Sequence, residues 1–361
     1  MLPRLVPRGE PSTAMVWLTP VLAVALTLVC GMALFAGMGF DPLDALYAYF
    51  VEPVSTRFGL AELAVKTTPL ALIAVGLAIG FRANVWNIGA EGQLTMGAVL
   101  GGGLALAAYG AEGPWLMPLM LVAGALGGMA WAAIPAFLRT RFNASEILTS
   151  LMLVYVAGLL LNWLVHGPWR DPDGFNFPQS RMFNPEALLP SLLDGTRLHL
   201  GFPLALVAVA AGWFLLARTF VGFQIKVLGL TPAAASYAGF DRNRLVWFCL
   251  LASGALAGLA GVVEAAGPIG QLVPSISPGY GFTAIIVAFL GRLHPAGILP
   301  AAALVALSYI GGESAQITMQ LPVAVTGVFQ GMLLFFLLAS DVLIRYRVRW
   351  GAAGGVREAV P

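Results

Sequence analysis

The chain has 361 residues, of which 59% are hydrophobic and only 10% are charged, and its mean hydropathy is +0.86. A soluble domain usually has about a quarter charged residues, so the composition excludes a water-soluble fold. Because helices and closed barrels alone satisfy every backbone group in hydrocarbon, we expect an all-α polytopic membrane protein. The formal charge of +2 does not indicate nucleic-acid binding.

About ten segments are apolar enough to cross a bilayer, which takes about 20 residues each. They cover residues 15–39, 60–81, 93–109, 114–138, 147–165, 200–217, 245–265, 282–291, 296–310 and 321–344. The eighth is too short to cross alone. We expect one transmembrane domain over residues 15–344, between a tail at residues 1–14 and a tail at residues 345–361.

The basic residues predict the orientation of this domain. If the N-terminus is cytoplasmic and ten spans alternate, 14 of the 19 Lys and Arg residues lie inside, as the positive-inside rule expects. The inside set is Arg4, Arg8, Arg82, Arg139, Arg141, Arg218, Lys226, Arg242, Arg244, Arg292, Arg345, Arg347, Arg349 and Arg357. Both termini are therefore predicted to be cytoplasmic, in a bacterial cell (inner) membrane.

Two segments are predicted on the outer side. Residues 41–57 indicate a surface helix, capped by Asp41 and opened by Pro42, with Tyr47 on its apolar face. Residues 166–199 form a long loop rich in Pro, Asp, Asn and Gly, which predicts irregular structure. Its aromatic residues, including Phe175 and Phe177, are consistent with a docking surface for an external protein or with a loop that only caps the bundle.

Residues 218–244 form the longest internal loop, RTFVGFQIKVLGLTPAAASYAGFDRNR. Thr231 can cap a short helix there, Pro232 suits its first turn and Gly239 can end it. A short helix on the cytoplasmic side has no lipid to bury against, so we expect it to need a partner. The alternative is that it packs on its own bundle.

Glycines recur at four-residue spacing within the spans, as in Gly124 with Gly128 and Gly254 with Gly258. Such pairs let helix backbones approach closely, so they predict a compact bundle.

The segment FRANVWNIGAEGQLTMGA, residues 81–98, places polar residues between two apolar runs. The uncharged run between Lys66 and Arg82 is 15 residues long, or about 22 Å as a helix, shorter than a hydrocarbon core of about 30 Å. We therefore expect a broken or re-entrant helix around residues 82–100.

Two interpretations of this segment remain open. In the first, Arg82 ends one helix, Asn87 caps the next and Glu91 complements its dipole. In the second, polar side chains line the pathway of an uncharged polar solute, because polar groups at membrane depth are usually functional. The pathway candidates are Asn84, Asn87, Glu91 and Gln93.

The NIGAEGQ core at residues 87–93 resembles the signature of nucleoside-type permeases within the ribose and branched-chain amino acid permease family of ABC importers. Two further stretches are similar to that family, namely residues 221–244 and GYGFTAIIVAFLGRLHPAGILPAA at residues 279–302. The resemblance covers roughly residues 41–344. It implies half of the translocation pathway of an ATP-driven importer for a nucleoside, or alternatively for a simple sugar.

The resemblance also implies the partners of the chain. They are a cytoplasmic ATPase subunit, a second related permease subunit in a heterodimer, and an extracytoplasmic solute-binding lipoprotein. The helix that fits the ATPase cleft would be the coupling helix, formed by Pro232, Ala234, Ala235, Ala238, Gly239 and Phe240.

Enzymatic activity is not expected of this chain. It has no G-x-x-x-x-G-K-[ST] phosphate loop, so ATP and magnesium are expected on the partner ATPase. Its three His residues are isolated, and no catalytic, cofactor-binding or metal-binding set is predicted. The rival class is an ion-coupled secondary transporter, which commonly places ionisable relays in mid-span.

Overall fold

A computed structural model describes residues 3–8, 12–110 and 113–350 of the chain. Eight of the described helices are long and apolar enough to cross a membrane. The contacts divide the chain into two compact units, one of residues 50–311 and one that combines residues 1–49 with residues 312–361.

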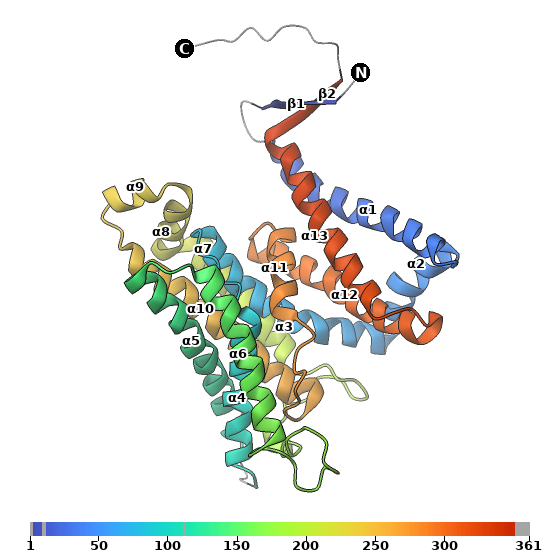
Figure 1. Ribbon diagram of the computed structural model, residues 1–361, viewed down its shortest axis with the longest axis vertical. Helices are drawn as coiled ribbons and strands as arrows, with labels where there is room; N and C mark the ends of the chain where they lie inside the picture. Colours follow the sequence, from blue (N-terminus) through green and yellow to red (C-terminus); the bar gives the residue numbers. More distant parts are fainter. Residues whose placement is uncertain (1–2, 9–11, 111–112, 351–361) are drawn as a thin grey trace. The chain divides into compact units, whose positions relative to one another are not determined.

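The unit of residues 50–311 is a helical bundle. Its elements are the 3-10 turn Glu52–Val54, α3 (Arg57–Arg82), α4 (Ala90–Ala107), α5 (Leu116–Phe142), α6 (Glu146–His166), the 3-10 turn Pro185–Ala187, α7 (Gly201–Arg218), α8 (Phe220–Leu230), α9 (Pro232–Tyr237), α10 (Arg242–Glu264), the π-helical turn Ala265–Ile269, α11 (Tyr280–Leu290) and most of α12 (Pro295–Met319). Helix α10 is central and packs against α3, α4 and α5, and Figure 1 shows α4, α5, α6 and α10 running side by side.

Helices α5 and α10 cross through the predicted glycine pairs. A Cβ atom on Gly128 would lie 2.0 Å from the Gly254 carbonyl oxygen, and one on Gly258 would lie 2.2 Å from the Gly124 carbonyl oxygen. No side chain fits at such distances, so the backbones touch directly. This confirms the close approach that the spacing of the glycines predicts.

The second unit pairs the two ends of the described chain. Helix α1 (Thr13–Gly37) packs against α13 (Ala324–Arg345), and α2 (Pro42–Phe50) follows α1. Phe35, Tyr49 and Phe329 form an aromatic cluster, with the Tyr49 and Phe329 rings stacked at 4.8 Å. Strands β1 (Pro3–Pro7) and β2 (Tyr346–Trp350) pair antiparallel, with Arg4 opposite Arg349.

The predicted spans agree closely with the helices. The eighth predicted span is short, as expected, since α11 has 11 residues; α4 has 18 residues and is also not among the eight membrane-spanning candidates. The predicted break is confirmed, since α3 ends at Arg82 and α4 begins at Ala90. The irregular structure predicted for residues 166–199 is confirmed between α6 and α7.

Three expectations were wrong. The ninth span does not stop at residue 310, because α12 continues to Met319 with Gly312 packed tightly on Thr326. The short helix at 42–50 buries Ala45 and Tyr49, while Tyr47 is 59% exposed, so its buried face is rotated from the predicted one. The Thr231 side chain caps no helix, although Asp41 does cap α2 by accepting from the Leu43 amide.

Candidate functional site

The break between α3 and α4 is held by a buried polar network. Asn87 donates through Nδ2 to Gln93 Oε1 at 2.7 Å and to Ser253 Oγ at 2.9 Å, while Gln93 Nε2 donates back to Asn87 Oδ1 at 3.0 Å. Asn87 Oδ1 also accepts from the Gly89 amide at 3.1 Å. All three side chains are nearly inaccessible. The network joins the break to α4 and to α10.

This network leaves the Asn87 amide without spare hydrogen-bonding capacity. Both Nδ2 hydrogens and both Oδ1 lone pairs are used within the chain. In this conformation Asn87 therefore fixes the position of the break. Ser253 could not be predicted as its partner from local patterns, because the two residues are 166 positions apart and only the packing of α10 on the break brings them together.

Glu91 points in another direction, toward the start of α11. Its Oε2 accepts from the Gly281 amide at 2.6 Å. A Cβ atom on Gly281 would lie 2.2 Å from the Glu91 nitrogen, so the two helix starts are in backbone contact. A carboxylate at a helix N-terminus complements the helix dipole. Glu91 therefore links α4 to α11 and complements the dipole of α11. The sequence had suggested instead that Glu91 complements the dipole of its own helix, α4.

Asn84 lies apart from this network and is exposed. Its backbone is left-handed at φ +57°, and its Oδ1 accepts from Trp86 Nε1 at 2.9 Å. It lines a small cavity of about 50 Å³ together with Arg139, Arg242 and Pro232. The four predicted pathway residues thus fall into three groups: an exposed Asn84, a bonded Asn87–Gln93 pair, and Glu91 of α4, which is bonded to the start of α11.

The internal loop folds into the two helices α8 and α9. Thr219 caps α8 by accepting from the Gly222 amide at 3.1 Å. Gly239, at φ +75°, ends α9 as predicted, with the Phe240 amide donating to the Ala235 carbonyl. A six-residue helix has little stability of its own, so its position depends on packing.

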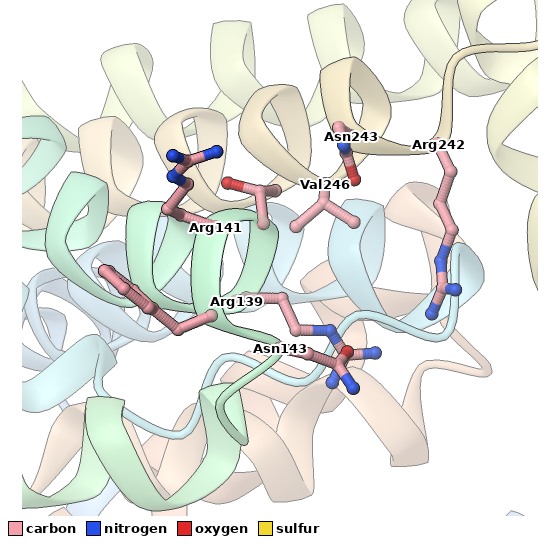
Figure 2. A pocket seen from close by; sticks show the side chains of 8 residues that line it. Arg139, Arg141, Asn143, Arg242, Asn243 and Val246 are labelled. Carbon is pink, nitrogen blue, oxygen red and sulfur yellow. The ribbon is translucent and has the colours of Figure 1, made fainter.

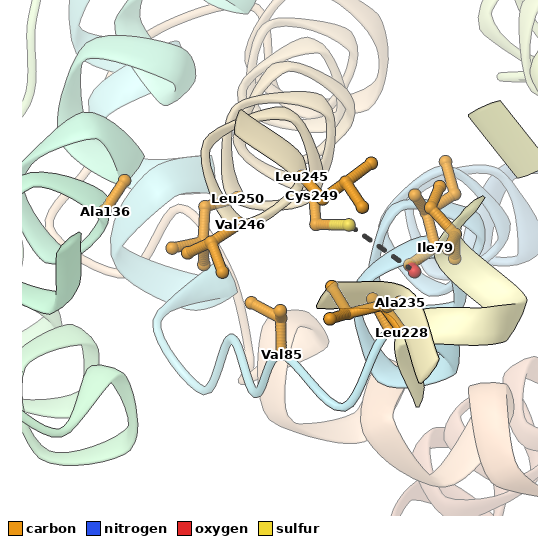
Figure 3. Close-up of a cluster of buried hydrophobic side chains, with 11 residues drawn as sticks. Ile79, Val85, Ala136, Leu228, Ala235, Leu245, Val246, Cys249 and Leu250 are labelled. Carbon is orange, nitrogen blue, oxygen red and sulfur yellow. Dashed lines mark hydrogen bonds between the residues drawn. The ribbon is translucent and has the colours of Figure 1, made fainter. Parts of the chain in front are cut away.

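Ala235 provides that packing. It is 2% exposed and belongs to a hydrophobic cluster with Val85 of the break, Leu228 of α8 and Cys249 of α10 (Figure 3). The α9 segment is therefore docked on the bundle next to the break. The face of α9 that carries Ala235 therefore packs on its own bundle, which is the alternative given in the sequence analysis.

The other face of α9 is open. Tyr237 is 97% exposed and Leu230 is 74% exposed, and the small residues Ala234, Ala238 and Gly239 around Tyr237 are exposed too. We call these five residues the α9 surface. Exposed apolar side chains that gather in one place mark interaction sites more often than single ones do. The α9 surface is thus a candidate contact for another protein.

The loop between α6 and α7, which is predicted to be external, is anchored at its base and exposed at its tip. Arg197 forms a bidentate ion pair with Glu62 of α3, at 3.0 Å and 2.5 Å. At the tip, Phe175 is 93% exposed and Phe177 is 65% exposed. The loop therefore presents two aromatic rings on a fixed base.

His199 lies at that base and is buried at 3% exposure. Its Nδ1 accepts from the Gly201 amide at 3.1 Å. Burial lowers the pKa of the imidazole to about 4, although the charge of Glu62 opposes the shift. Among the described residues, no group of three or more His, Cys, Asp and Glu residues could hold a metal ion.

Comparison with known proteins places these features in a family. The family described as "Branched-chain amino acid transport system / permease component" matches residues 59–338. The chain is 36% identical to the glucose ABC transporter permease protein TsgB13 of Haloferax volcanii, over 96% of this chain and 93% of that protein.

Two nucleoside permeases are similar over nearly the whole chain. The guanosine ABC transporter permease protein NupP of Bacillus subtilis is 30% identical, over 91% of this chain and 94% of NupP. The nucleoside ABC transporter permease protein NupB of Lactococcus lactis is 27% identical, over 90% of this chain and 92% of NupB. The chain therefore belongs to the family of ABC transporter permease components, multi-pass membrane subunits that work with a separate ATPase and are not themselves enzymes.

Proposed function

We propose that this permease subunit forms half of the translocation pathway of an importer for nucleosides. The observation that carries this proposal is the similarity of nearly the whole chain to NupP and NupB, together with the NIGAEGQ sequence at the break. A simple sugar is the second candidate, favoured by the 36% identity to TsgB13.

The α9 surface is, in this proposal, the contact of the ATPase. Tyr237 would enter the ATPase, and the small neighbours Ala234, Ala238 and Gly239 would let the two backbones come close. Pro232 and Phe240 bound the segment, and Ala235 fixes it to the bundle. Movement of the ATPase would then reach the break through the cluster that Ala235 shares with Val85. ATP and magnesium bind the ATPase subunit in this scheme.

The pathway residues are proposed to act in two ways. Asn84, which is exposed, has an amide nitrogen free to contact solute, while Asn87, Glu91 and Gln93 hold the break that presents it. The division follows from the hydrogen bonds, since the buried Asn87 amide has no capacity left for solute in this conformation.

Two further partners complete the proposed assembly. A second, different permease is supported by the guanosine permeases NupP and NupQ, which both occur in Bacillus subtilis and are both similar to this chain. An extracytoplasmic solute-binding lipoprotein would dock on the outer loop, at Phe175 and Phe177. The assembly would lie in the bacterial inner membrane, with both termini of this chain in the cytoplasm.

The test is ATP hydrolysis by the complete complex, co-expressed and reconstituted in vesicles with its binding protein. We expect adenosine or guanosine to raise hydrolysis severalfold and glucose to have no effect. Stimulation by glucose alone would replace the nucleoside with a sugar. Uptake by this chain alone, driven by a proton or sodium gradient, would contradict the importer itself.

A further inference from the structure

A basic cavity lies between the end of α5 and the start of α10. Its volume is about 320 Å³. Figure 2 shows Arg139, Arg141 and Asn143 at the end of α5, and Arg242 and Asn243 at the start of α10. None of the residues that line it is acidic. Guanidinium and amide groups together are typical ligands of a phosphate.

The charge around this cavity is not balanced within the described residues. Arg139 is paired with Glu146, and nearby Arg244 is paired with Asp241. Arg141 and Arg242 have no ion pair in the part of the chain that the structure describes, and both are exposed. Two positive charges thus remain for a ligand.

The cavity has fixed walls. Trp247 Nε1 of α10 donates to Thr140 Oγ1 of α5 at 3.0 Å, which holds the two helix ends together. Asn143 adopts the left-handed conformation at φ +52° and ends α5, with the Ala144 backbone amide donating to the Leu138 carbonyl. The helix ends that carry the arginines are therefore held in place within the chain, and ligand binding does not have to order this backbone.

An apolar surface leads into the cavity along α5. Ile134 is 38% exposed, Phe137 is 50% exposed, and Phe142, which lines the cavity, is 66% exposed. Exposed apolar side chains on a membrane-spanning helix are suited to acyl chains. Basic pockets between transmembrane helices on the cytoplasmic side bind anionic lipid head groups, and the arginines here are on the side predicted to be cytoplasmic.

We propose that this cavity binds the phosphate of an anionic phospholipid from the cytoplasmic leaflet, with Arg141 and Arg242 as its main ligands and its acyl chains on α5. Arg139 and Arg242 also line the small cavity beside Asn84 and Pro232. The bound lipid would therefore lie next to both the break and α9. This site is independent of the identity of the transported solute.

The test is native mass spectrometry of the complete transporter in mild detergent, with dioleoylphosphatidylglycerol compared with dioleoylphosphatidylcholine. We expect selective retention of the anionic lipid, and a loss of about 25-fold in its affinity in Arg141→Gln/Arg242→Gln, since each charge contributes about fivefold. Arg141→Lys/Arg242→Lys should retain most of the binding. The control Arg8→Gln/Arg347→Gln, which removes equal charge on the same predicted side, should bind as the parent does.

Each of four results would overturn the proposal. They are equal retention of the two lipids, unchanged retention in Arg141→Gln/Arg242→Gln, equal loss in the Arg8→Gln/Arg347→Gln control, and binding of inorganic phosphate with no retention of either lipid, which would make the site one for free phosphate. Loss of the ATPase from Arg141→Gln/Arg242→Gln with lipid retention unchanged would instead assign the cavity to an acidic segment of the partner.

Discussion

The break between α3 and α4 and the α8–α9 segment are both interruptions of the bundle, but they treat polarity in opposite ways. The break places polar side chains inside the bundle and bonds them to each other, as Asn87 does with Gln93 and Ser253. The α8–α9 segment places large apolar side chains outside, with Tyr237 at 97% exposure. The polar groups of the break are thus bonded within the chain, while the α9 surface leaves Tyr237 exposed for the contact proposed above.

The difference shows what each kind of residue does in a membrane protein. A polar group at membrane depth is costly unless it is bonded, so its presence first reports an internal network. Apolar side chains gathered on an exposed surface are suited to contact with another protein, which is the role proposed for the α9 surface. Substitutions in the first region should change stability, and those in the second should change assembly.

The largest expected effect is on the glycine crossing that supports the break. Gly258→Leu should destabilise the protein by about 4 kcal/mol or more, because its first side-chain carbon would lie 2.2 Å from the Gly124 oxygen and would force α5 from α10. Thermal unfolding in detergent measures this. Gly158→Leu is the matched control, since no atom lies within 4 Å of a Cβ at that helical glycine; equal loss in both variants would disprove the close crossing.

Removal of the Asn87 side chain should have the next largest effect. Asn87→Ala leaves Gln93, Ser253 and the Gly89 amide without their partner, at a cost of about 1 kcal/mol each, or about 3 kcal/mol in all. The unfolding temperature should fall and uptake should be lost. Asn84→Ala, at an exposed position, should keep the unfolding temperature. If Asn87→Ala unfolds like the parent protein, the network does not hold the break.

His199, in the loop between α6 and α7, is a buried titratable group outside the predicted spans. Its protonation should therefore change the stability of the protein with pH. The folded pKa of His199 is about 4, below its unfolded value of about 6.5, so the unfolded state binds more protons between these values. Stability is therefore fully present above pH 6.5 and declines as the pH falls toward 4.

Between pH 7.5 and pH 5 this decline should be about 2 kcal/mol. His199→Asn retains an acceptor near the Gly201 amide but does not titrate, so its unfolding temperature should depend less on pH over this range. A pH dependence identical in both proteins would show that His199 is not the group responsible.

The smallest free-energy change is expected at the α9 surface, where it affects binding and not folding. Tyr237→Ala should weaken ATPase association about tenfold, equivalent to about 1.4 kcal/mol, with an unchanged unfolding temperature. Titration of the purified ATPase measures it. Tyr47→Ala, at another exposed tyrosine, should bind the ATPase normally. Unaltered association in Tyr237→Ala would place the ATPase contact elsewhere.

The sequence predicted most of the fold because hydropathy and charge act locally. The span positions, the break after Arg82 and the end of α9 at Gly239 all follow from composition and backbone preferences over short stretches. The continuation of α12 past residue 310 could not be predicted, because glycine is common in turns and the packing of Thr326 on Gly312 is visible only in the structure.

The candidate site was predicted less completely. The polar residues of the break were found, but their separation into Asn84, the Asn87–Gln93 pair and Glu91 depends on Ser253 and Gly281, which are far away in the sequence. Likewise, the exposure of Tyr237 and the burial of Ala235 on one short helix depend on how α9 lies on the cluster. The grouping of the break residues and the two faces of α9 are both determined by packing partners that are distant in the sequence, and local sequence patterns do not reveal these partners.

The most direct test of the account is to measure nucleoside uptake into vesicles by the complex of this chain with its ATPase, second permease and binding protein, with the parent chain and with Tyr237→Ala. If the chain is a subunit of an ATP-driven nucleoside importer, uptake will require ATP and every partner, and it will fall in Tyr237→Ala in proportion to lost ATPase association. Uptake that continues without the ATPase, driven by an ion gradient, would contradict it.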